Sequence, residues 1–217
     1  MNCLKSKRKK VQESVENVAL NPCLGNKQAV DAKNKLDSNI IDSSPHYNER
    51  LITWLREVNR KSVPKLLYRA SRDGWQTHSF HSLCDAYKHT LVVVKTNQGY
   101  IFGGYSNQSW KGFGFKKSDR SFLFTLKCYA GLRPHKMKVK AGMEKTAVYL
   151  HPTNGPCFGD GQDFWIVLQG RKKDRMKKGW AIANQNYEIP AGAAQNFLAG
   201  KSSNEYFHFE EIEVFKV

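Results

Sequence analysis

Two histidines and a cysteine at helical spacing form the first candidate site for chemistry. His78, His81 and Cys84 follow one another at intervals of three residues, and imidazole and thiolate groups are common zinc ligands. Residues three apart are neighbours on a helix, but His78 and Cys84 diverge, and the pattern supplies no fourth ligand. We therefore interpret the three side chains as ordinary helix residues and expect no metal and no other cofactor.

Cys84 is also a candidate nucleophile, because the cysteine and histidine of a thiol enzyme need not be adjacent in sequence. It follows Phe80 by four residues and shares an apolar helix face with it, which predicts a buried, unreactive thiol. Cys157 is the second thiol that such an enzyme would use. We expect no catalytic residue and no enzymatic activity, with an unrecognised thiol-dependent enzyme as an alternative.

Two glycine patterns lack the spacing that nucleotide binding requires. Gly200-Lys201-Ser202 resembles the end of a phosphate-binding loop, but Gln195 stands where that loop needs its first glycine. Gly112 and Gly114 begin a GxG pattern whose third glycine position holds Lys117. We interpret these residues as loop glycines.

Two further classes of site are disfavoured. No GxSxG motif marks a serine hydrolase. Asp160 and Asp163 lie in a Gly-rich stretch, but they supply fewer oxygen ligands than calcium needs. We interpret both as loop carboxylates.

Positive charge is the strongest compositional signal. Lys and Arg number 35 against 19 acidic residues, a formal charge of +16 in 217 residues, which favours an acidic partner such as nucleic acid, anionic lipid or an acidic protein face. The densest cluster, residues 170–179, is interpreted as a surface loop joining two strands. It lacks a recognition motif and interleaved aromatic residues, so a basic nucleic-acid-binding module stays an alternative function. The predicted patch comprises Arg171, Lys172, Lys173, Arg175, Lys177 and Lys178.

Cysteine usage and hydropathy bear on location. The five cysteines are scattered singly, without a CxxC pair, which is typical of a reducing compartment. No apolar run approaches the length that spans a bilayer, and no apolar segment follows the basic N-terminus as a secretory signal requires. We expect a cytoplasmic protein, with the nucleus as a second location because of the N-terminal lysine cluster.

Hydrophobic periodicity predicts a mainly β (α+β) fold. Strands are expected at 65–69, 90–95, 100–105, 121–127, 136–140, 146–150, 164–168 and 206–217, with a bulge at Glu210-Glu211. Helices are expected at 39–58 and from Thr77, and residues 106–117 and 151–162 are expected to be loops. Many short strands and few helices predict a two-sheet antiparallel β-sandwich flanked by short helices.

Composition divides the chain into two parts. Residues 1–38 are polar and basic, and we expect a disordered tail there. Residues 39–217 carry the apolar periodicity and form one domain. We expect the domain to be a monomer.

Several separated motifs, in order, resemble the TLDc domain of the eukaryotic oxidation-resistance proteins. The resemblance covers residues 39–217 and extends over the whole expected domain. The matching segments are LLYRASRDGW (66–75), FHSLCD (80–85), TLVVVKTNQGYIFGGY (90–105), FLFTL (122–126), GPCFGDGQDFWI (155–166), NFLAG (196–200) and EEIEVFKV (210–217).

The resemblance implies a β-sandwich without an established catalytic site. It also implies protection against oxidative stress and binding to subunits of the vacuolar-type proton-pumping ATPase, at endolysosomal or vacuolar membranes. Asp160 stands where the family usually has glycine, and the 171–178 stretch is unusually basic, which puts a shared partner surface in doubt. The family-motif positions, structural or in contact with a partner, are Arg72, Asp73, Gly74, Gly103, Gly104, Gly155, Gly159, Gly161 and Glu213.

These motif residues also have local structural interpretations. Arg72 and Asp73 are expected to form an internal ion pair that holds a turn, and Gly103 and Gly104 to permit close backbone packing. Glu213 lies between the inward-facing Ile212 and Val214 and should point to the opposite side. There it is either solvated or hydrogen-bonded to another strand.

Overall fold

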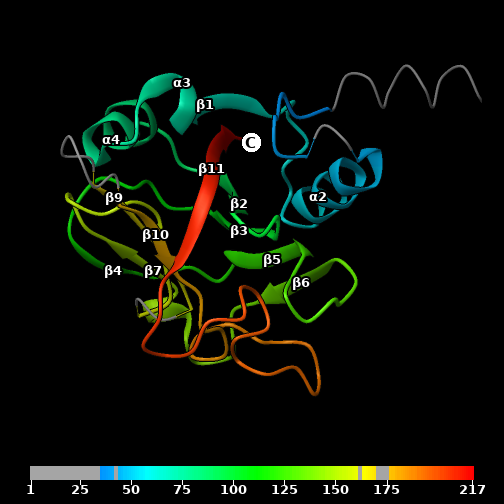
Figure 1. Cartoon of the computed structure of the whole chain (residues 1–217). Helices are drawn as coiled ribbons and strands as arrows, with labels where there is room; N and C mark the ends of the chain where they lie inside the picture. Colours follow the sequence, from blue (N-terminus) through cyan, green and yellow to red (C-terminus); the bar gives the residue numbers. More distant parts are fainter. Residues whose placement is uncertain (1–34, 42–43, 161–162, 170–175) are drawn as a thin grey trace, which may run out of the picture. The chain divides into compact units, whose positions relative to one another are not determined.

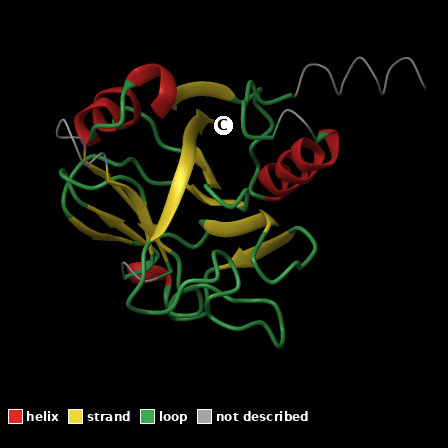
Figure 2. Cartoon of the chain, viewed as in Figure 1, coloured by secondary structure: helices red, strands yellow, loops and turns green. Residues whose placement is uncertain are grey.

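The computed structural model describes residues 35–41, 44–160, 163–169 and 176–217. The elements are shown in Figures 1 and 2 and run in the following order. They are α2 (Pro45–Glu57), β1 (Lys65–Arg69), α3 (Ala70–Asp73), α4 (Thr77–Cys84), β2 (Thr90–Thr96), β3 (Ile101–Ser106), β4 (Gly114–Lys116), β5 (Phe122–Lys127), β6 (His135–Lys138), η1 (Glu144–Thr146), β7 (Val148–Leu150), β8 (Cys157–Phe158), β9 (Phe164–Gln169), β10 (Met176–Trp180) and β11 (Phe207–Lys216).

The strands form two antiparallel sheets that share β11. The first sheet has the order β1-β11-β2-β3-β5-β6, and the second has the order β4-β7-β8-β9-β10-β11. The start of β11 pairs with β10 through Phe207 and His208, and the rest pairs with β2 after a register shift between Phe209 and Glu211. The irregularity predicted at residues 210–211 is therefore confirmed, and it marks where β11 passes from one sheet to the other.

Two apolar layers bury both faces of the first sheet. Its inner face, including Val92 and Val94, packs against the second sheet in the larger core cluster. Its outer face, including Leu91 and Val93, packs against α2, which contributes Leu51 and three further buried side chains. Figure 1 shows α2 on the side of β5 and β6, with β4, β7, β9 and β10 on the other side of β11. The β-sandwich flanked by short helices is confirmed.

Four predicted assignments differ from the structure. Leu36 and Ser38 are 1% and 3% exposed, so residues assigned to the tail pack into the domain. Residues 1–34 lie outside the described part of the chain. Residues 106–117 and 151–162, expected to be loops, contain the short strands β4 and β8. Lys177 and Lys178, expected in a loop, belong to β10.

Paired glycines on β3 allow the closest packing in the first sheet. A methyl group at Gly103 would meet the backbone carbonyl of Val92, and one at Gly104 would lie 2.7 Å from Cζ of Phe158 in the opposite sheet. The close-packing interpretation of both glycines is therefore supported by the geometry.

Substitution of Gly103 by alanine is expected to destabilise the domain by about 3 kcal/mol, because the added methyl group meets backbone that cannot rotate away. Gly142 provides the control, since it has a positive φ of 88° but no atom within 4 Å of the place that a methyl group would occupy. Gly142→Ala should cost about 1 kcal/mol from backbone strain alone. Urea unfolding measures both changes, and equal losses in the two variants would contradict close packing at Gly103.

Candidate functional site

The charged family-motif residues lie together at the junction of β1 and β11. Glu213 is fully buried and accepts a 2.7 Å hydrogen bond from Nε of Arg69, its cross-strand partner. Its carboxylate also accepts hydrogen bonds from the Ser38 hydroxyl and the Asn39 backbone N–H. Glu213 therefore joins β1 and β11 to the segment that precedes α2. Of the two expected environments, solvated or hydrogen-bonded to another strand, the structure shows the hydrogen-bonded one.

Arg72 and Asp73 close the turn between β1 and α4. Nε and Nη2 of Arg72 donate to the two carboxylate oxygens of Asp73 at 2.8 and 2.9 Å, and Nη2 also donates to the Leu67 carbonyl. Asp73 accepts a further hydrogen bond from the Arg69 backbone N–H. Burial favours a higher pKa for Asp73, but these hydrogen bonds outweigh it and lower the pKa. The expected ion pair is present, and Gly74 follows it with a φ of 100°.

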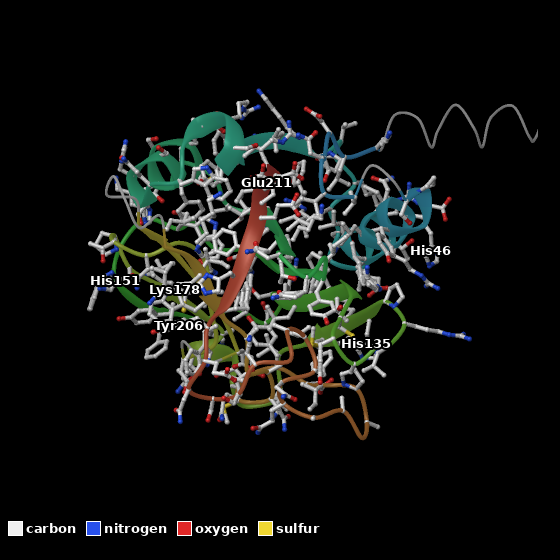
Figure 3. All side chains as sticks on the ribbon, in the orientation of Figure 1. His46, His135, His151, Lys178, Tyr206 and Glu211 are labelled. Atoms are coloured by element: carbon white, nitrogen blue, oxygen red, sulfur yellow. The ribbon has the colours of Figure 1, made fainter. Side chains whose placement is uncertain are left out.

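Glu211 and Tyr68 complete the cluster. Oε1 of Glu211 accepts hydrogen bonds from the backbone N–H groups of Ser71 and Ile212. The hydroxyl of Tyr68 donates to the Gly74 carbonyl at 2.8 Å, and burial raises the pKa of this phenol. Figure 3 shows Glu211 on β11 near the β1 and α3 end of the domain.

The cluster has paired carboxylates of the kind used in acid–base catalysis, but its geometry is that of a structural joint. The Glu213 carboxylate accepts hydrogen bonds from three neighbouring groups, and Glu211 accepts one from the backbone N–H of Ser71 in α3. A carboxylate that is closed off from solvent in this way offers no open position for a substrate. We assign the cluster to positioning β1, α3 and residues 37–39 on β11.

A second motif region surrounds Asp163 in the second sheet. Asp163 is fully buried, and its oxygens accept hydrogen bonds from the backbone N–H groups of Asn184, Gln185 and Asn186 at 2.8–3.0 Å. Burial raises its pKa to about 6, against the lowering effect of these hydrogen bonds. Asp163 therefore anchors residues 184–186 to the start of β9.

Two motif glycines of this region lie where a side chain would meet neighbouring atoms. Gly159 has a φ of 74°, and a methyl group there would meet the Asp163 carboxylate. A methyl group at Gly155 would lie 3.0 Å from the Ile166 carbonyl oxygen. Gly161 lies outside the described residues.

The predicted basic patch is only partly described. Arg171, Lys172, Lys173 and Arg175 lie outside the described residues. In β10, the Lys177 ammonium lies 3.4 Å from the Trp75 ring centroid, and that of Lys178 lies 3.9 Å from the Tyr206 ring centroid. Both lysines therefore make cation–π contacts within the domain.

The described thiols are poor nucleophiles. Cys84, Cys128 and Cys157 are buried. Burial raises the pKa of Cys84 far above its usual value and that of Cys157 to about 12, so neither forms thiolate readily at neutral pH. These observations argue against the alternative of a thiol-dependent enzyme based on Cys84 or Cys157.

His81, one of the candidate metal ligands, uses both ring nitrogens in other contacts. His81 contacts Asp85 at 2.7 Å through Nδ1 and the Asn154 carbonyl at 3.0 Å through Nε2. Within the described ranges, no group of three or more His, Cys, Asp or Glu residues could hold a metal ion.

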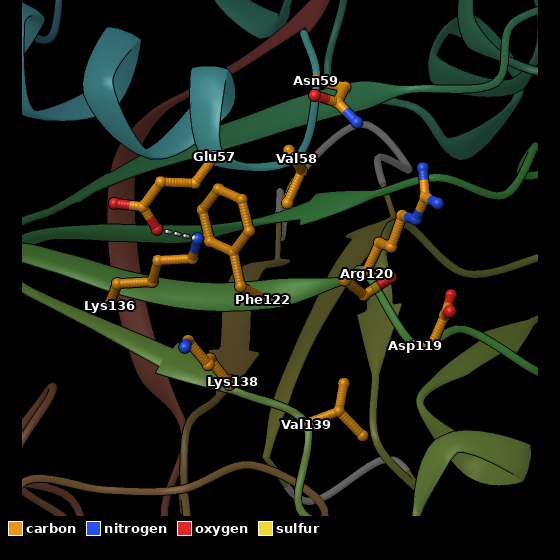
Figure 4. A pocket seen from close by; sticks show the side chains of 10 residues that line it. Glu57, Val58, Asn59, Asp119, Arg120, Phe122, Lys136, Lys138 and Val139 are labelled. Carbon is orange, nitrogen blue, oxygen red and sulfur yellow. Dashed lines mark hydrogen bonds and ion pairs between the residues drawn. The ribbon is translucent and has the colours of Figure 1, made fainter.

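One open pocket of about 440 Å³ lies between the end of α2 and strands β5 and β6 (Figure 4). Its charged residues include Glu57, Asp119, Arg120 and Lys136. Lys136 is paired with Glu57 at 2.7 Å and lies 4.5 Å from the Phe122 ring centroid. With Lys136 committed to this pair, the lining, which also includes Lys138, does not present the convergent reactive side chains of an active site.

Comparison with known proteins identifies the domain. A family model described as the TLDc domain matches residues 36–217. The chain belongs to the TLDc domain family. Its start at residue 36 agrees with the burial of Leu36 and Ser38.

Curated relatives share the domain at low identity. TBC1 domain family member 24 from Xenopus tropicalis is 21% identical over 154 residues, covering 69% of this chain and 27% of that protein. The Xenopus laevis protein of the same name is 21% identical over 68% of this chain and 26% of its own length. MTOR-associated protein MEAK7 from Danio rerio is 30% identical over 87 residues, 37% of this chain and 19% of that protein. The chain thus spans about a quarter of the TBC1 domain family member 24 proteins.

The ion pair of Arg69 and Glu213 is expected to dominate the stability of the joint. Arg69→Met or Glu213→Gln alone should each cost about 3 kcal/mol, because either substitution leaves a buried charge without its partner. The double variant should lose less than the sum, with a coupling of about 1–3 kcal/mol in urea unfolding.

Arg72→Met is the matched control for that cycle, since the Arg72 side chain is 48% exposed. It should cost less than about 1 kcal/mol, as exposed ion pairs usually do. Additive losses for Arg69→Met and Glu213→Gln would contradict the assigned role.

Asp163 is expected to make the stability of the TLDc domain depend on pH. Its folded-state pKa is raised to about 6, so the folded state holds a proton that the unfolded state has already released. The contribution of Asp163 to the free energy of unfolding should therefore fall as pH rises from about 4 to about 6, by about 2 kcal/mol.

Urea unfolding at closely spaced pH values measures this dependence, with Asp163→Asn as the comparison. The difference between the wild type and the variant should shrink across the window as pH rises. A difference that stays constant between pH 4 and pH 7 would contradict the raised pKa.

Proposed function

We propose that the chain is a non-catalytic TLDc binding module that acts on the vacuolar-type proton-pumping ATPase. The observation that carries the proposal is the internal pairing of the charged motif residues. Glu213, Glu211, Asp73 and Arg72 hold elements of the domain together, and the described thiols are buried with raised pKa values at Cys84 and Cys157. A domain whose candidate reactive groups are committed to its own fold is suited to docking through its outer surface.

The choice of partner rests on the resemblance of the motifs to proteins that bind the proton pump. Protection against oxidative stress is the proposed cellular outcome, and the cytoplasmic side of endolysosomal or vacuolar membranes is the proposed location. Within the described residues, no helix combines the length and the apolar character needed to cross a bilayer. One relative is named for association with MTOR, which makes MTOR a second protein to assay.

The basic stretch at residues 171–178 departs from the family pattern, and we propose it as this chain's own contact with an acidic face of the pump. Charge complementarity steers encounter and fixes register between proteins, and this stretch holds six of the chain's basic residues. The affinity should consequently fall as salt concentration rises.

The test is biolayer interferometry of the full chain against the purified pump and its isolated soluble sector, with ATP hydrolysis measured in parallel. We expect saturable binding and a changed hydrolysis rate. Arg171→Glu combined with Lys173→Glu should weaken binding at least tenfold. Lys61→Glu combined with Lys65→Glu, the same charge change at exposed positions, should leave affinity within about twofold. Absence of binding by the folded wild type at low salt would contradict the proposal.

A further inference from the structure

Four aromatic rings gather on the outer surface of the second sheet. Phe113 and Phe115 are 70% and 48% exposed, which is unusual for large apolar side chains. Their ring centroids lie 6.1 and 5.0 Å from that of Tyr149 on β7. His151 adds a fourth ring, 5.3 Å from Phe113 and 6.2 Å from Tyr149. We call these four residues the aromatic platform.

Strand pairing places two of the four rings on the outer face of the second sheet. Phe115 and Tyr149 are direct cross-strand partners, while Val148 and Leu150 on either side of Tyr149 point into the core. β4 is the last strand in the order of its sheet. Figure 3 places His151 on the side of the domain away from His46 of α2, so the platform lies on a different surface from that covered by this helix.

Exposed lysines flank two of the rings in the sequence. Lys111, Lys116 and Lys117 are exposed and flank Phe113 and Phe115 in the sequence. The two segments that supply the rings, residues 105–118 and 147–159, contain these three lysines and no Asp or Glu. The surface thus combines exposed aromatic rings with exposed lysines that flank them in the sequence.

Residues 111–115 follow a known nucleic-acid-binding pattern. Lys111-Gly112-Phe113-Gly114-Phe115 has the residue types of the first five positions of the RNP1 motif, in which aromatic side chains on a sheet stack on bases. Lys116 and Ser118 depart from the later apolar and aromatic positions of that motif. Gly114 has a φ of 89°, and both phenylalanine rings nevertheless reach the same neighbour, Tyr149.

We propose that the aromatic platform binds single-stranded nucleic acid, with bases stacked on Phe113, Phe115 and Tyr149. Lys111 and Lys116 contact the flanking phosphates. Every base has a π-face, so recognition of this kind tolerates different sequences and depends on salt.

The geometry favours a single strand over two other acidic ligands. A duplex keeps its bases stacked inside, so it offers no base faces to the rings. A membrane would be entered by apolar side chains projecting from a mobile loop or an amphipathic helix, whereas Phe115 and Tyr149 are held as cross-strand partners and Phe113 packs against Tyr149. The Phe113 and Phe115 rings are inclined at 66° and 59° to that of Tyr149 and remain 70% and 48% exposed, which leaves ring surface on which unstacked bases can stack.

The test is fluorescence anisotropy of the full chain with a labelled 12-nucleotide oligo(U) that contains one 2-aminopurine, at about 50 mM salt. We expect a saturable rise in anisotropy together with quenching of the 2-aminopurine, which reports stacking directly. Phe113→Ala combined with Phe115→Ala should weaken binding at least tenfold and abolish the quenching. Lys111→Glu combined with Lys116→Glu should weaken binding and reduce its salt dependence.

Tyr129→Ala is the matched control, because Tyr129 is 58% exposed outside the platform. It should bind within about twofold of the wild type, and circular dichroism should show each variant folded. Duplex RNA and phosphatidylserine vesicles are assayed in parallel and should bind more weakly, without dependence on Phe113 and Phe115. No binding to the single strand, binding that the double phenylalanine variant retains, or a phenylalanine-dependent preference for vesicles would overturn the proposal.

Discussion

The buried contact between Glu213 and Arg69 is the constraint on which the arrangement of the domain depends. β11 carries a carboxylate at a position with no exposure to solvent, and such a charge is tolerated only when it is paired and fully hydrogen-bonded. The required donors come from Arg69 on β1 and from Ser38 and Asn39 before α2. One carboxylate thus fixes two segments that are distant from it in sequence.

Because β11 belongs to both sheets, the contact between Glu213 and Arg69 influences both of them. Its first residues pair with β10 and the remainder with β2 and β1, so the strand joins both sheets of the sandwich. The larger core lies between the sheets, and the smaller one lies between the first sheet and α2. Because the first sheet is covered on both faces, we propose the second sheet, the connecting loops and the basic β9–β10 segment (residues 171–178) as the surfaces for partners.

Much of the fold could be predicted because its signals are local. The strand predicted at 65–69 has the observed bounds, and the irregularity near Glu210 follows from the change in apolar phase along β11. Short strands were harder to predict. β8 has two residues in a Gly-rich stretch, too few for any periodicity to show.

The contacts of the candidate site were less predictable because they are long-range. The Arg72–Asp73 pair joins adjacent residues and could be expected, whereas Glu213 meets Ser38 across 175 positions of sequence. The hydrogen bonds of Asp163 are equally hard to predict from the sequence. Their donors are backbone N–H groups 21–23 residues later, and a backbone donor does not depend on the residue type. Arg69 lies within the LLYRASRDGW segment, but its pairing with Glu213 follows only from the register of β1 on β11.

We propose that the motif residues build the TLDc scaffold and that partners dock on its outside. Hydrogen–deuterium exchange of the full chain, alone and with the soluble sector of the vacuolar-type ATPase, tests this claim most directly. We predict new protection in the outer loops and the basic β9–β10 segment, with exchange unchanged around Arg69, Asp73 and Glu213. Protection centred on those three residues, or none anywhere in the domain, would contradict it.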